Sequence, residues 1–152
     1  MRVIGLDVGE RRIGVAISDA TRTLARPVGV LQVSRLDATA VVRAADEVAR
    51  LASEDDGVGT IVVGLPRRLD GRPNDMTPRV QAFAAQLGVR TGLPIVLQDE
   101  RLTSHEAEAL LAARDKDWRS RKKRLDAVAA ALILQDHLDT LGHPDHLDGS
   151  SH

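Results

Sequence analysis

The apolar residues of this chain follow a two-residue period at the start and helical spacings further on. Residues 3–8 and 12–18 are largely apolar, and a turn at Gly9–Arg11 separates them. This arrangement predicts a β-hairpin. A third strand is expected from Leu24 to Val33, so the opening part of the chain should be an antiparallel meander of three strands.

Helical and strand patterns alternate in the remainder of the chain. Helices are expected at 38–53, 77–87, 103–113 and 123–141, and strands at 60–66 and 94–100. Gly88 is expected to end the second of these helices. Strands that alternate with helices pair in parallel through right-handed crossovers. The predicted fold class is therefore α/β, with a five-stranded mixed sheet and helices on both faces.

Size and composition narrow the possibilities further. Residues 1–141 are expected to form one domain, and residues 142–152, which lack periodicity, a flexible tail. The chain has no cysteine, which excludes thiolate metal sites and fits a reducing compartment. No apolar stretch approaches the ~20 residues that span a bilayer, so no membrane partner is expected. A cytoplasmic location follows from these features.

Three acidic residues stand where predicted elements begin or end. Asp7 closes the first strand, Glu100 closes the fifth, and Asp126 lies in the first turn expected for the last helix. The ends of parallel strands gather at one edge of a sheet, so these carboxylates should share a cleft. Divalent cations would relieve their repulsion, and carboxylate oxygens suit Mg²⁺ or Mn²⁺. Such a site supports phosphodiester cleavage.

Each of these carboxylates also has a purely structural interpretation. Asp7 can end a strand and cap the turn that follows, and Glu100 can pair with Arg101. Asp126 can favour the positive end of a helix. Spacing alone leaves both interpretations open.

Basic residues cluster in two segments of a chain whose net charge is only −1. The loop that follows the fourth strand carries Arg67, Arg68 and Arg72. The segment 114–124 sets seven basic residues against two acidic ones, and these seven are Arg114, Lys116, Arg119, Arg121, Lys122, Lys123 and Arg124. Local patches of this kind hold a nucleic-acid backbone through its phosphates. The alternative is a solvated linker.

Four sequence blocks resemble the signature blocks of the YqgF/RuvX family. They are GLDVGERRIGVAISD, VVGLPRRLDG with the downstream MTPRVQAFAAQL, DERLTSHEAEALL, and KKRLDAVAAALILQ. They occur in the family's order and extend over residues 1–138. Members of this family are regarded as Holliday-junction resolvases, or as nucleases that mature the small-subunit ribosomal RNA precursor.

The resemblance implies a ribonuclease H-like fold with an acidic site at Asp7, Glu100 and Asp126. It also implies a nuclease dependent on Mg²⁺ or Mn²⁺, acting in 5′-end maturation of that precursor. A resolvase acting on DNA junctions and a non-catalytic, ribosome-associated nucleic-acid-binding factor are the alternatives. The expected partner is an RNA precursor or structured DNA, with the protein a monomer or a homodimer and in possible association with the ribosome. GLDVG also resembles the phosphate-binding hairpin of sugar kinases, but 152 residues supply only one of the two domains that those enzymes close around a nucleotide.

Overall fold

Five strands form a single mixed sheet in the computed structural model, which describes residues 1–68, 70–100 and 118–141. The order across the sheet is β3-β2-β1-β4-β5. β2 is antiparallel to both β1 and β3, whereas β1, β4 and β5 run parallel to one another. The strands are β1 (Arg2–Val8), β2 (Arg12–Ser18), β3 (Ala25–Gln32), β4 (Val58–Leu65) and β5 (Ile95–Asp99). The predicted meander and the predicted parallel portion are both confirmed.

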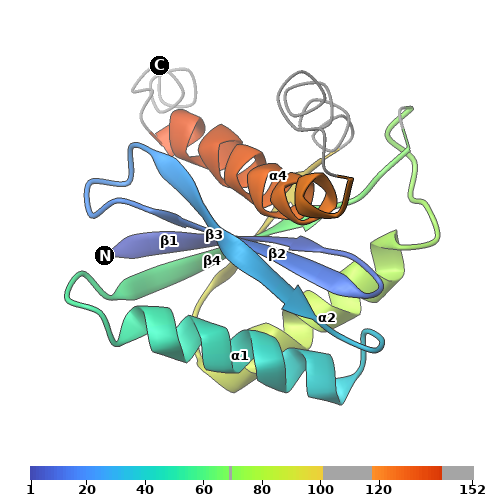
Figure 1. The fold of residues 1–152 in the computed structure, drawn as a ribbon, viewed down its shortest axis with the longest axis horizontal. Coiled ribbons are helices and arrows are strands. Elements are labelled where there is room, and N and C mark those ends of the chain that lie inside the picture. Colours follow the sequence, from blue (N-terminus) through green and yellow to red (C-terminus); the bar gives the residue numbers. More distant parts are fainter. Residues whose placement is uncertain (69, 101–117, 142–152) are drawn as a thin grey trace, which may run out of the picture.

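Helices cover both faces of this sheet (Figure 1). α1 (Ala38–Ala52) and α2 (Thr77–Thr91) pack side by side on one face, and α4 (Trp118–Leu141) crosses the other. The predicted α/β fold class is therefore correct. Within the described ranges, no helix has both the length and the apolar character that a membrane crossing requires.

The alternation of side chains along β1 divides the core into two layers. Ile4, Leu6 and Val8 join the buried cluster on the side of α1 and α2. Val3 points to the opposite face and packs in a cluster with residues of α4. Because successive side chains alternate, Asp7 shares the face of Val3 and lies beneath α4.

Three glycines on neighbouring strands bring α4 unusually close to the sheet. A methyl group on Gly5 of β1 would lie 2.7 Å from Leu134 Cβ, and one on Gly64 of β4 would lie 2.5 Å from Ile133 Cδ1. A methyl group on Gly14 of β2 would overlap the backbone carbonyl of Asp126. Such distances are too short for a real side chain. The helix therefore rests on a glycine seat formed by Gly5, Gly14 and Gly64.

Two predicted helix boundaries are wrong. α2 continues past Gly88 to Thr91, and Gly92, with a φ of 73°, terminates it in the left-handed conformation. α4 begins at Trp118 rather than near residue 123, so Asp126 lies in the third turn and not the first. The helix predicted at 103–113 and the tail predicted at 142–152 lie outside the described residues.

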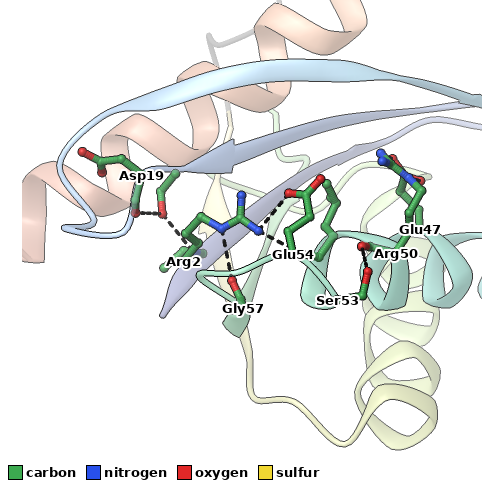
Figure 2. A network of polar contacts seen from close by, with 10 residues as sticks. Arg2, Asp19, Glu47, Arg50, Ser53, Glu54 and Gly57 are labelled. Carbon is green, nitrogen blue, oxygen red and sulfur yellow. Dashed lines mark hydrogen bonds and ion pairs between the residues drawn. The ribbon is translucent and has the colours of Figure 1, made fainter.

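A buried arginine ties the start of β1 to the end of α1 (Figure 2). Arg2 is only 6% exposed, and it donates hydrogen bonds to the carbonyl oxygens of Leu51 and Gly57, at 2.9 and 3.2 Å. It also forms an ion pair with Glu54 at 3.0 Å. These contacts satisfy carbonyls at and beyond the last turn of α1. Arg2 is therefore a structural residue far from the carboxyl ends of the parallel strands.

Candidate active site

Two of the three predicted carboxyl groups meet at the carboxyl ends of the parallel strands. Asp7 lies near the end of β1, and Glu100 follows β5 directly, with its amide donating to the carbonyl oxygen of Leu65 at 3.3 Å. The side chains of Asp7 and Glu100 share a hydrogen bond. β4 runs between their strands, and there Gly64 leaves the necessary space, since a methyl group on it would lie 3.1 Å from Glu100 Oε2.

The electrostatics of this pair favour one shared proton. Burial raises the pKa of Glu100 to about 9, and the charge of Asp7 together with their hydrogen bond raises it as well. Burial also raises the pKa of Asp7, to about 6, with the hydrogen bond from Glu100 opposing that rise and the charge of Asp126 adding to it. At neutral pH Glu100 therefore keeps the proton and donates a hydrogen bond to the Asp7 carboxylate.

Asp126 approaches Asp7 from α4 and pairs with an arginine of the sheet. Asp126 Oδ2 lies 2.7 Å from Arg12 Nε, and both side chains keep about a quarter of their surface exposed, at 26% and 29%. Asp126 lies close enough to Asp7 for its charge to raise the pKa of that residue. A cavity of about 280 Å³ joins them, and its lining consists of Asp7, Gly9, Glu10, Arg11, Arg12 and Asp126.

The donor atoms available here fit a hard divalent cation in part. Glu100 Oε2 is buried, and apart from the carboxyl group of Asp7 no hydrogen-bond partner reaches it among the described residues, a costly arrangement that a cation would relieve. However, no three acidic or histidine side chains in the described part of the chain are gathered closely enough to hold a metal ion together. Asp7 and Glu100 could bind such an ion, whereas Asp126 would first have to leave Arg12.

The arginines of the loop after β4 lie near the same end of the sheet. Arg67 Nε forms an ion pair with Asp99 Oδ1 at 2.9 Å, at the end of β5, and Arg72 pairs with Asp70 at 2.8 Å. Arg68 is exposed to solvent. The predicted phosphate-binding side chains of this loop are therefore accessible, although two of them hold acidic partners in the same loop or on β5.

The second predicted basic segment is helical where the structure describes its backbone. Arg119, Arg121, Lys122, Lys123 and Arg124 belong to the first two turns of α4. Their side chains, together with all of Arg114 and Lys116, lie outside what the structure describes. The prediction of a connector between two helices is thus wrong for residues 118–124, because these residues already form part of α4 and lead along it toward Asp126.

The family model described as "RuvX: Holliday junction resolvase" matches residues 1–140. The chain belongs to this family. A relative from Pelotomaculum thermopropionicum, named "Putative pre-16S rRNA nuclease", is 41% identical over 95% of this chain and 90% of its own length. A relative of the same name from Chloroflexus aggregans is 40% identical over 93% of this chain and 96% of its own length.

Solved structures of low sequence identity share the family's fold. The Holliday junction resolvase of fowlpox virus is 12% identical, with a TM-score of 0.55 over 93% of this chain and 99% of its own. Thermus thermophilus RuvC is 16% identical, with a TM-score of 0.52 over 93% and 97% of the two chains. The family and the ribonuclease H-like fold implied by the sequence blocks are therefore confirmed.

Arg12 is the residue of this RuvX-family site that sequence reasoning missed. Its side chain reaches the middle of α4, which is distant in sequence, so no local pattern could indicate the partner. One signal was present in the sequence. Arg12 stands two residues before Gly14 on the same strand, and Gly14 pairs with Asp7 across the hairpin, so the two-residue period places Arg12 on the acidic face.

Proposed function

We propose that this protein is a metal-dependent nuclease that cleaves phosphodiester bonds in nucleic acid, with 5′-end maturation of the small-subunit ribosomal RNA precursor as its task. The observation that carries the proposal is the hydrogen-bonded pair of half-buried carboxyl groups, Asp7 and Glu100, with Asp126 beside it. Relatives about 40% identical over nearly the whole chain carry the name of a pre-16S ribosomal RNA nuclease, which supports the choice of substrate.

The site residues divide into metal ligands and phosphate-binding residues in this proposal. Asp7, Glu100 and Asp126 would hold Mg²⁺ or Mn²⁺ through their carboxylate oxygens. Bound there, the metal would activate the attacking water and stabilise the leaving oxygen. Glu100 must give up its proton to become a ligand, because only the carboxylate form binds a cation well. The arginines of the loop after β4 and the basic residues at the start of α4 would hold the phosphate backbone.

A resolvase acting on four-way DNA junctions is the second candidate. It is favoured by the description of the family and by the fold that the chain shares with the fowlpox virus resolvase. Symmetric cutting of a junction needs two active sites related by a two-fold axis, so this activity requires a homodimer. Processing of a single RNA strand does not. For the first candidate, the RNA nuclease, we propose that the protein acts as a monomer in the cytoplasm, in association with the ribosome.

The remaining candidate is a non-catalytic, ribosome-associated factor that binds nucleic acid. The presence of all three carboxylates argues against it, because the desolvation of Asp7 and Glu100 would cost stability without a chemical role. It predicts nucleic-acid binding with no cleavage under any metal condition, and the same experiment therefore tests it.

The decisive experiment compares Asp7→Asn with the native protein. Cleavage of a ribosomal RNA precursor fragment and of a four-way DNA junction is measured with EDTA, Mg²⁺ or Mn²⁺. We expect metal-dependent cleavage of the RNA by the native protein and none by Asp7→Asn, which should bind the RNA at least as well as the native protein does in EDTA. Asp46→Asn is the matched control, since Asp46 is an exposed carboxylate on α1 across the sheet, and it should cleave at the native rate.

Thermal unfolding of the same variants separates chemistry from folding. Removing one carboxylate from the acidic pair should leave the metal-free protein at least as stable as the native one. Native-rate cleavage by Asp7→Asn would refute the mechanism, and a failure of that variant to fold would make Asp7 a structural residue. Cleavage of the junction alone would favour the resolvase.

A further inference from the structure

The ion pair between Arg12 and Asp126 occupies the wall of the acidic cavity. Arg12 is the first residue of β2, and its carbonyl accepts a hydrogen bond from the Gly9 amide at 2.8 Å, which fixes its backbone at the hairpin turn. Asp126 is fixed from the other side, because its own carbonyl rests on Gly14 in the glycine seat. The two side chains meet at 2.7 Å and remain partly open to solvent. Both backbones are therefore held in place, and the two side chains are partly accessible, although Asp126 Oδ2 itself is buried between them.

This pair is in conflict with metal binding at Asp126. A guanidinium Nε 2.7 Å from the carboxylate takes one of its oxygens and places a positive charge where a divalent cation would approach. A cation bound there would repel Arg12 and take over its partner. A partly exposed ion pair contributes little to stability, so a modest competing interaction is sufficient to open it.

The displaced guanidinium would need another anion, and the proposed substrate supplies one. Arginine binds phosphate oxygens in a two-pronged geometry, which makes a backbone phosphate a strong alternative to a carboxylate. We infer that Arg12 is a phosphate-binding residue that Asp126 masks in the resting protein, and that metal binding at Asp126 releases Arg12 to the nucleic acid. This inference rests on the proposed function, because it requires Asp126 to bind the metal.

Two consequences distinguish this exchange from a structural ion pair. Metal binding should raise the affinity for nucleic acid, because the metal takes Asp126 and so frees Arg12 for a phosphate. The coupling is reciprocal, so bound nucleic acid should raise the affinity for the metal. In addition, loss of Asp126 alone should unmask Arg12 and strengthen RNA binding even without metal. A purely structural pair predicts neither effect.

The first test is a double-mutant cycle in EDTA with a short fluorescent RNA oligonucleotide, read by anisotropy. Asp126→Asn should bind the RNA about threefold or more tightly than the native protein, and Asp126→Asn with Arg12→Gln should lose most of that gain. Arg11→Gln is the matched control. Arg11 is exposed on the same cavity and belongs to no ion pair among the described residues, so its removal should leave the Asp126→Asn gain in place.

The second test measures Mn²⁺ affinity by isothermal titration calorimetry without RNA. Arg12→Gln should bind Mn²⁺ about threefold to tenfold more tightly than the native protein, because the guanidinium then no longer competes with the ion for Asp126. Arg11→Gln should produce a smaller gain, which reports only the general loss of positive charge. Arg12→Lys keeps the charge, and it should resemble the native protein even if Arg12→Gln folds poorly.

The outcomes separate the inference from the proposed function. If the native protein binds no Mn²⁺, both the metal-dependent nuclease proposal and the exchange at Arg12 and Asp126 are refuted. If it binds Mn²⁺ but Arg12→Gln binds no more tightly than Arg11→Gln, the exchange is wrong and the nuclease proposal stands. Equal RNA gains from Asp126→Asn with and without Arg12 would also overturn the exchange, since the gain would then come from charge alone.

Discussion

The carboxyl groups of Asp7 and Glu100 share a hydrogen bond, although β1 and β5, which position them, are not neighbours in the sheet and have another strand between them. That strand is β4, and Gly64 is the residue that leaves the side chains room to meet. The pair holds a proton at neutral pH because burial and mutual repulsion both oppose a second negative charge. Its state is therefore sensitive to pH, to metal and to any side chain added on β4.

The metal-free protein should lose stability as the pH rises. Carboxyl groups with raised pKa values keep their protons in the folded state while the unfolded state has already lost them. Stability is then fully present below the ordinary values of 3.8 and 4.5, and is lost as the pH rises through about 6 for Asp7 and about 9 for Glu100. Raising a pKa by one corresponds to about 1.4 kcal/mol, so the two rises together correspond to a loss on the order of 9 kcal/mol across the whole range, most of it from Glu100.

Denaturant unfolding in EDTA across this pH range measures the effect. Glu100→Gln provides the control, because glutamine can still donate a hydrogen bond to Asp7 but has no proton to lose. In Glu100→Gln, the free energy of unfolding should no longer fall as the pH rises above about 6, the pKa of Asp7. Stability that is constant or increases with pH in the native protein would contradict the raised pKa values.

An alanine at Gly14 should be far more damaging than one at Gly29. The added methyl group at Gly14 collides with the backbone of α4, which cannot move without shifting the helix, whereas the same group at Gly29 of β3 meets nothing within 4 Å. We expect Gly14→Ala to cost about 2 kcal/mol or more and Gly29→Ala less than about 0.5 kcal/mol. Thermal unfolding checks both. Similar losses for the two variants would mean that the helix adjusts freely.

Arg2→Met should destabilise the fold without weakening RNA binding by the folded fraction. The change removes the charged side-chain donor from the carbonyls of Leu51 and Gly57, which keep only backbone donors, and a hydrogen bond from a charged group contributes about 1.5–3 kcal/mol. A total loss of about 2–4 kcal/mol is expected in denaturant unfolding. Arg26→Met, at an exposed position of β3, should change stability by less than about 0.5 kcal/mol. If Arg2→Met binds RNA more weakly than the native protein under conditions where both are fully folded, then Arg2 has a functional role.

Replacing the basic residues at the start of α4 with alanine should weaken RNA binding and flatten its salt dependence. The four positions are Arg121, Lys122, Lys123 and Arg124. For a single strand the slope of log affinity against log salt should fall by about 0.7 for each phosphate that the variant no longer binds. Alanine favours helix, so α4 should persist in circular dichroism.

The control for this variant removes four arginines elsewhere on the described surface. The four positions are Arg26, Arg35, Arg43 and Arg90. If both quadruple variants lose the same affinity, net charge alone explains the binding. If neither loses affinity at low salt, the basic start of α4 is only a solvated part of the helix.

The sequence was sufficient for the architecture because periodicity determines which face of each element is buried. It was insufficient at residues 118–124, where a charged segment without an apolar stripe was interpreted as a connector. Lysine and arginine are good helix formers, so these residues can extend α4 even though their sequence shows no apolar stripe.

Packing partners that are distant in sequence explain the other differences. Gly88 resembled a helix terminator, but a methyl group there would lie 2.9 Å from Ile95 Cγ1, so the glycine allows α2 to pack closely against β5. The ends of the predicted elements indicate Asp7, Glu100 and Asp126, but they give no sign that Arg12 pairs with Asp126. This contact depends on the packing of α4 against β2, which no local sequence pattern specifies.

The glycine seat also matters for protein engineering. Asp126 reaches the acidic pair because backbone, and not side-chain length, sets the height of α4 above β1, β2 and β4. A designer who transfers the three acids to another sheet with alanine or valine at those positions would hold the helix several tenths of an ångström or more too far away. The portable unit is therefore six residues, three acids and the three glycines beneath them.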